Sequence, residues 1–89
     1  MSNVQELERL LKALANRRRL SILKYLKRVK RASVGDVADE IKLSFKSTSR
    51  HLSVLSSADV IEKEQEGLVV WHMIVRHGNQ IVTKTLELL

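Results

Sequence analysis

The chain has 89 residues, with 16 Lys or Arg, 10 Asp or Glu and a net charge of +6 at neutral pH. This length predicts one domain, and a domain so small buries only roughly 60–65% of the surface that its unfolded chain exposes, so help from a partner subunit is expected. The sequence has no cysteine, which excludes disulfide bonds, thiolate metal sites and redox-sensing thiols. It also lacks an apolar run near the ~18 residues of a membrane span and a signal-peptide pattern, so we expect a cytoplasmic protein with no membrane partner.

The first predicted helix covers residues 3–15 and carries an apolar stripe. The segment Ser2-Asn3-Val4-Gln5 has the pattern of a capping box, which favours a helix start here. Apolar residues then recur at helical spacing, at Val4, Leu7, Leu10, Leu11 and Leu14. Such a stripe either folds back on the core of its own chain or packs against a second copy.

The second predicted helix follows the N-cap Asn16, covers residues 17–31 and is strongly basic. Residues 1–31 hold ten Lys or Arg against two Glu, which gives +8, whereas residues 32–58 sum to zero and residues 59–89 to −2. Ile22, Leu26 and Val29 mark its buried side. The opposite side carries a cation or a hydroxyl at each position of a stripe, namely Arg17, Ser21, Lys24, Arg28 and Arg31.

We consider three interpretations of this basic stripe: an ordinary solvated face, a set of contacts to DNA phosphates, or a docking surface for an acidic protein. Arg19 points toward the apolar side of the same helix. An ion pair with Asp36 or Glu40 is the expected arrangement for it.

Residues 33–58 have the pattern of a helix-turn-helix. Ser33 is the expected N-cap of a short helix that ends at residue 41, and residues 42–44 leave room only for a tight turn before a helix over residues 45–58 with Ser44 as its cap. At about 100° per residue, this last helix directs one set of side chains inward (Phe45, Thr48, Leu52, Leu55) and another outward (Lys46, Arg50, Ser53, Ser57). An outward face of cations and hydroxyls without a carboxylate favours nucleic acid as the partner.

Two β-rich runs follow, over residues 60–65 and 68–75, with Glu66-Gly67 as the predicted hairpin turn. A hairpin directly behind a recognition helix is a wing. Its tip, residues 64–68, is acidic, so we expect it to touch DNA little or only through its backbone. A last predicted helix, over residues 79–88, has an apolar side made by Ile81, Val82, Leu86 and Leu89.

Several of these segments match one known pattern. They are residues 14–23 (LANRRRLSIL), Leu43-Ser44, residues 47–52 (STSRHL) with Val54-Leu55, and Glu66-Gly67 before a β run. Together they cover about residues 7–75 and resemble the ArsR/SmtB family of winged-helix repressors. The resemblance implies a mainly α fold of about five helices with a small β-hairpin wing, and a dimeric regulator of transcription that binds double-stranded DNA. We expect a sequence-specific repressor formed by a single domain, residues 1–89.

The resemblance also implies which residues bind DNA and which pair the subunits. Major-groove contacts would fall on Lys46, Ser47, Ser49 and Arg50; we add Ser44 and Ser53 and, as candidate phosphate contacts, Arg17, Lys24, Arg28 and Arg31. Because family members dimerise through their terminal helices, the expected dimer contacts are Val4, Leu7, Leu11, Leu14, Ile81, Val82, Leu86 and Leu89. A two-fold dimer would place its recognition helices about 34 Å apart on a roughly palindromic site.

The remaining chemistry-bearing side chains predict neither a metal site nor a cofactor. Metal-sensing relatives carry thiolates at the start of the helix before the turn, where this chain has Ser33, Gly35 and Asp36, and its C-terminal helix offers only Glu87. His51 is expected to be a packed or hydrogen-bonded helix residue. Phe45 and Trp71 are expected to pack against the core, with contact to a thymine methyl as the alternative for Phe45.

A second class of function is a winged-helix protein-interaction module that docks an acidic partner through the basic second helix, and the acidic wing favours it. An enzyme is not expected, because no nucleophile–base pair, phosphate-cradling loop or carboxylate dyad is present. With one Phe, one Trp and one Tyr, the chain also offers no stacking platform for single-stranded nucleic acid.

Overall fold

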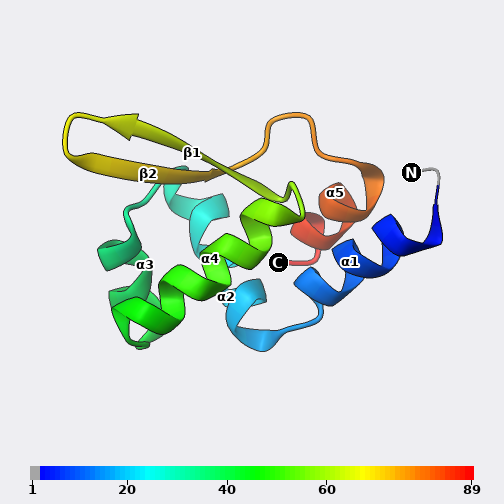
Figure 1. Ribbon diagram of the computed structural model, residues 1–89, viewed down its shortest axis with the longest axis horizontal. Coiled ribbons are helices and arrows are strands. Elements are labelled where there is room, and N and C mark those ends of the chain that lie inside the picture. Colours follow the sequence, from blue (N-terminus) through cyan, green and yellow to red (C-terminus); the bar gives the residue numbers. More distant parts are fainter. Residues whose placement is uncertain (1–2) are drawn as a thin grey trace.

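The computed structural model describes residues 3–89 and places five helices and one hairpin in them (Figure 1). The order of the elements is α1 (Val4–Leu14), α2 (Arg17–Val29), α3 (Val34–Ile41), α4 (Phe45–Ser57), β1 (Ile61–Glu66), β2 (Val69–Ile74) and α5 (Gln80–Glu87). The predicted fold class, a mainly helical winged helix-turn-helix, is confirmed.

Side-chain caps set where the helices begin. Asn16, Ser33 and Ser44 each accept a hydrogen bond from the backbone N–H three residues on, as the sequence predicts for α2, α3 and α4. Asn3 does the same for α1, and Ser2 of the predicted capping box lies outside the described residues. These bonds satisfy N–H groups that have no partner within their helix.

The second helix is shorter than predicted. It ends at Val29, because Lys30 adopts a positive φ of 79° and its N–H bonds to the carbonyl of Leu26. Arg31 therefore lies in the connection after α2 and does not continue the helical stripe of Arg17, Lys24 and Arg28.

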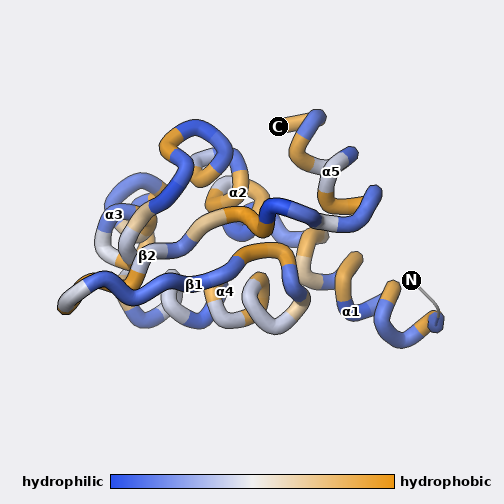
Figure 2. Tube along the Cα trace, turned by 90° about the horizontal axis from the view of Figure 1, so that it is seen from above, coloured by the Kyte–Doolittle hydropathy of each residue, from blue (hydrophilic) through white to orange (hydrophobic). Residues whose placement is uncertain are grey.

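The core surrounds α2, which contacts α1, α3, α4, α5 and β2. Ile22, Leu23 and Leu26 of α2 are buried against Leu52 and Leu55 of α4 and other members of one apolar cluster. In the view of Figure 2, α4 lies below α2 and α5 lies to its right. Burial of these side chains is the main stabilising contribution available to so small a chain.

The hairpin pairs β1 and β2 in antiparallel register from Ile61 opposite Ile74 to Glu66 opposite Val69. The two turn residues are thus Gly67 and Leu68, one position later than the predicted turn at Glu66-Gly67. Gly67 has a φ of +63°, which glycine adopts without strain at the first position of a two-residue hairpin turn. Two backbone hydrogen bonds between Ala32 and His72 attach the hairpin to the segment before α3.

Candidate nucleic-acid interface

Helix α4 has a buried apolar face and an exposed polar face, as its sequence predicts. Thr48, Leu52 and Leu55 are buried against the core. Lys46 and Arg50 are exposed on the opposite side. The hydroxyl residues of this side and its flanks are exposed (Ser44, Ser53, Ser57) or half-buried (Ser47, Ser49). The exposed face carries two cations and several hydroxyl groups, and the α4 sequence contains no carboxylate.

A tight turn fixes α4 against α3. Lys42 adopts the left-handed conformation, with φ 56° and ψ 52°, and closes α3 through a hydrogen bond from its N–H to the carbonyl of Ala38. The N–H of Leu43 bonds to the same carbonyl, at 3.1 Å. Ser44 then begins α4, and its Oγ accepts from the N–H of Ser47 at 3.1 Å. Helix, three-residue turn and helix form the predicted helix-turn-helix.

Arg19 does not form the expected ion pair with Asp36 or Glu40. Its Nε donates to the carbonyl of Ala13 at 2.6 Å and its Nη2 to the carbonyl of Lys12 at 3.0 Å, so it satisfies carbonyls at the end of α1. Its Nη1 lies 3.2 Å from Nδ1 of His51 in α4. Helical-wheel reasoning predicted the inward direction of Arg19 but could not show that free carbonyls lay nearer than a carboxylate.

His51 is hydrogen-bonded, as expected, and serves as the acceptor. A guanidinium can only donate, so Nδ1 of His51 accepts and the imidazole is neutral. Burial lowers the pKa of His51, and the positive charges of Arg19, Arg18 and Arg50 lower it further. The neutral form is therefore the one that holds Arg19 against α4.

Phe45 is exposed, which corrects the expectation that it packs into the core. Its side chain is 63% exposed at the first position of α4. On the helical wheel, Phe45 lies on the same side as Leu52. Along the helix, however, it lies one turn before the part of α4 that contacts the core, and it is not among the core residues or those packed against them. The predicted inward face of α4 therefore begins at Thr48.

The wing carries an ion pair near its tip. Nη1 of Arg31 lies 3.3 Å from Oε2 of Glu66, and the Arg31 guanidinium lies 4.3 Å from the centroid of the Trp71 ring. The indole nitrogen of Trp71 is buried. Arg31 thus offsets one carboxylate of the acidic wing. The sequence does not reveal this pair, because Arg31 and Glu66 are 35 positions apart.

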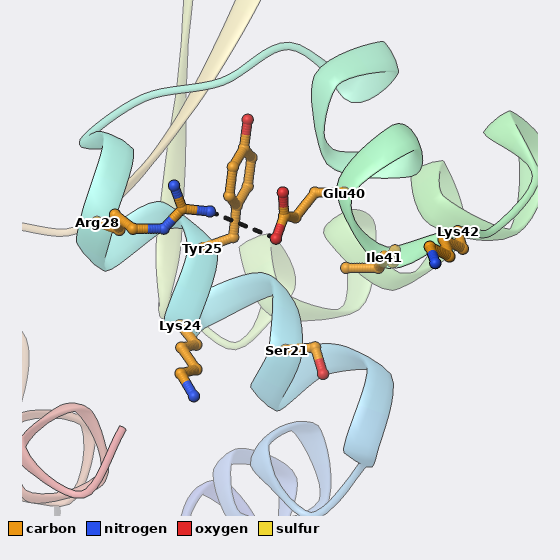
Figure 3. A pocket seen from close by; sticks show the side chains of 7 residues that line it. All are labelled: Ser21, Lys24, Tyr25, Arg28, Glu40, Ile41 and Lys42. Atoms are coloured by element: carbon orange, nitrogen blue, oxygen red, sulfur yellow. Dashed lines mark ion pairs between the residues drawn. The ribbon is translucent and has the colours of Figure 1, made fainter.

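The basic stripe of α2 borders a cleft between α2 and the end of α3. The cleft measures about 400 Å³, and Lys24, Arg28 and Lys42 contribute its cations (Figure 3). Arg28 lies 3.3 Å from the carboxylate of Glu40 and 5.3 Å from the centroid of the Tyr25 ring. One of the three cations is therefore paired within the chain.

Residues of this stripe line the surface between the C-terminal residue and the turn before α4. Arg17 and Lys24 border a surface depression together with Leu89, which follows α5, and Lys24 and Arg28 border the cleft that Lys42 also lines. Because α4 buries its apolar face against α2 and α3, its polar face points the other way. The expectation that Arg17, Lys24 and Arg28 contact DNA phosphates stays a prediction.

The apolar residues expected at a dimer interface fall into two groups. Leu14 and Val82 are only 6% and 2% exposed because they belong to the core of this chain, so they are not available to a second copy. Ile81, Leu86 and Leu89 are half-buried against the same core. Val4 and Leu11 remain exposed on α1, and with Leu7 they border an apolar surface depression.

Residues 3–89 contain no group of three or more His, Asp or Glu side chains placed to hold a metal ion. No helix within that range is long and apolar enough to cross a membrane.

A comparison with protein-family models identifies the kind of protein to which this architecture belongs. Residues 16–63 match the model described as bacterial regulatory protein, arsR family. The matched segment covers α2, α3, α4 and the first residues of β1, and so includes the whole helix-turn-helix.

The chain belongs to the arsR family.

This ArsR-family chain is similar to several solved structures. HlyU from Vibrio cholerae N16961 is 31% identical with a TM-score of 0.80, and the match covers 98% of this chain and 90% of HlyU. The homodimeric winged helix-turn-helix DNA-binding domain of Mb0332 from Mycobacterium bovis is 28% identical with a TM-score of 0.79, over 94% and 74% of the two chains. The transcriptional repressor PagR of Bacillus anthracis is 26% identical with a TM-score of 0.78, over 94% and 92%. No curated protein sequence matches this chain significantly.

Membership of the arsR family decides between the two functions considered from the sequence. This ArsR-family chain is a DNA-binding regulator of transcription, which is favoured over a module that only docks an acidic protein.

Proposed function

We propose that the chain is a homodimeric repressor of a single domain that acts at DNA in the cytoplasm and reads the major groove of a roughly palindromic duplex with α4. The observation that carries this proposal is the exposed face of α4, where Lys46 and Arg50 stand among hydroxyl groups with no carboxylate. Arginine and lysine donate to guanine O6 and N7, and serine donates or accepts at any base edge. Repulsion from phosphate is absent on this face because no side chain of α4 is acidic.

The contacts within the proposed interface follow from the position of each side chain along α4. Lys46, Ser47, Ser49, Arg50 and Ser53 are the groove contacts. Ser44 already uses its Oγ to cap α4, so its part is to present the first N–H groups of the helix to a phosphate. The candidate phosphate contacts are Arg17, Lys24 and Arg28 of α2 and Arg31 beside the wing.

The dimer is proposed on the exposed apolar surface of α1, with Val4, Leu7 and Leu11 against their counterparts in a second copy. Leucine side chains left in water forgo roughly 1.5–3 kcal/mol each of favourable burial, so a second apolar surface is the natural cover. The homodimeric Mb0332 domain, with the same fold, supports a homodimer but does not indicate which helices form it.

The test is a titration of duplex binding with salt, after the bound sequence has been selected from a random duplex pool. If five to eight phosphates are neutralised across the dimer, the logarithm of the binding constant should fall by about 4–7 for each tenfold rise in salt. Arg50→Ala should weaken the selected duplex by about 1–3 kcal/mol and relax the preference at one base pair of each half-site. Absence of duplex binding at low salt, or an unchanged preference in Arg50→Ala, would contradict the proposal.

A further inference from the structure

Phe45 is an exposed apolar side chain at the N-terminal end of the polar face of α4. It is the only phenylalanine of the chain and 63% exposed, whereas its neighbours on the exposed surface of α4, among them Lys46 and Ser49, are cationic or polar. It does not belong to the core cluster or to the side chains packed against that cluster. Most of its ring is thus available to a partner, and the solvent-exposed state is the unfavourable one for it.

The position of Phe45 on α4 determines which partner it can meet. It is the first residue of the helix, directly after the cap Ser44 and before Lys46. In a helix-turn-helix, the N-terminal residues of the recognition helix contact the base edges. Phe45 would therefore lie at the floor of the groove together with Lys46.

The base edges of the major groove offer one apolar group to such a ring. Guanine, adenine and cytosine present hydrogen-bond donors and acceptors there, and thymine adds its C5 methyl. A phenyl ring forms no hydrogen bond that would compensate a displaced water at a polar edge, but it can cover a methyl group. We infer that Phe45 is a specificity-determining residue that selects thymine by contact with its C5 methyl. This inference rests on the proposed reading of the major groove by α4.

The experiment removes the methyl groups from the DNA one at a time. Each thymine of the selected duplex is replaced by deoxyuridine, which keeps the hydrogen-bonding groups and lacks only the methyl. At one thymine in each half-site, replacement should weaken the wild-type protein about fourfold, the effect of burying one methyl group, ~0.8 kcal/mol. In Phe45→Ala the same replacement should have no effect, and Phe45→Leu should retain part of the sensitivity.

Val54→Ala is the matched control, because Val54 is another exposed apolar residue of α4 but lies near its other end. It should respond to deoxyuridine as the wild type does. Equal sensitivity in wild type and Phe45→Ala would overturn the inference, as would selected sites without thymine. If Phe45→Ala weakens every duplex alike and deoxyuridine has no effect, the ring acts by stacking and the inference is wrong. If the wild-type protein binds no duplex at all, the proposed function itself is rejected.

Discussion

At the scale of single residues, two histidines make stability depend on pH. Burial is the largest cause that lowers the pKa of both His51 and His72. An unfolded histidine takes up a proton as the pH falls through about 6.5, while these two stay neutral in the folded chain. The unfolded state therefore binds more protons below that pH, and the free energy of unfolding should decrease as the pH falls from about 6.5 toward the lowered folded values.

Urea unfolding at pH 7.5, 6.5, 5.5 and 5.0 checks this prediction. The loss should be less than about 1.4 kcal/mol per pH unit for each histidine, since that is the slope for one whole proton. His51→Gln should reduce the pH dependence, because it removes one of the two groups whose pKa is lowered. A stability that stays constant or rises between pH 6.5 and 5.0 would contradict the assignment.

At the scale of helices, the base contacts proposed for α4 and the phosphate contacts proposed for α2 predict different effects of two lysine substitutions. Lys46→Ala, on the exposed face of α4, should weaken the selected duplex by about 1–3 kcal/mol and relax the preference at the base pair that Lys46 contacts. Lys24→Ala removes a candidate phosphate contact, so it should weaken all duplexes alike and reduce the salt slope by about one. Fluorescence anisotropy with the selected duplex and an unrelated one measures both.

A Lys24→Ala protein with unchanged affinity for every duplex would remove Lys24 from the candidate phosphate contacts. Arg28 makes a poorer test than Lys24, because Arg28→Ala would also leave Glu40 without its partner.

The sequence predicted the starts of the helices better than the end of α2, and the difference has a physical reason. Caps and helical spacing are local, so Asn16, Ser33 and Ser44 predicted three helix starts correctly. The end of α2 was predicted two residues late, because Lys30 carries no sequence signal for the positive φ that ends the helix.

The candidate site was predicted where it depends on one helix and missed where it depends on how helices are placed. The polar face of α4 follows from periodicity alone. By contrast, Arg19 and Arg31 have partners on other elements, His51 on α4 and Glu66 on β1. A stripe of cations on α2 shows that the helix has a polar side but not which side of the molecule it faces.

At the scale of the whole molecule, the proposed dimer makes DNA affinity depend on α1. Leu11→Glu places a charge on the exposed apolar surface and should shift the protein from dimer to monomer in sedimentation experiments, with a fold retained because Leu11 is 46% exposed. Affinity for a two-half-site duplex should fall by at least about tenfold, because a monomer loses the gain from tethering two recognition helices.

Leu88→Glu is the control for this prediction, since Leu88 is 87% exposed at the other end of the chain. It should leave both the mass and the affinity unchanged. A Leu11→Glu protein that still sediments as a dimer would place the subunit interface elsewhere.

The three hydrogen bonds of Arg19 have a consequence for such a dimer. One planar, charged group is attached at once to the last turn of α1 and to the middle of α4. In a dimer built on α1, the helix that sets the distance between subunits is therefore tied to the helix that enters the groove. A molecule that separates the two α1 helices would therefore tilt the α4 helix of each subunit through the Arg19 guanidinium, although it binds far from the DNA.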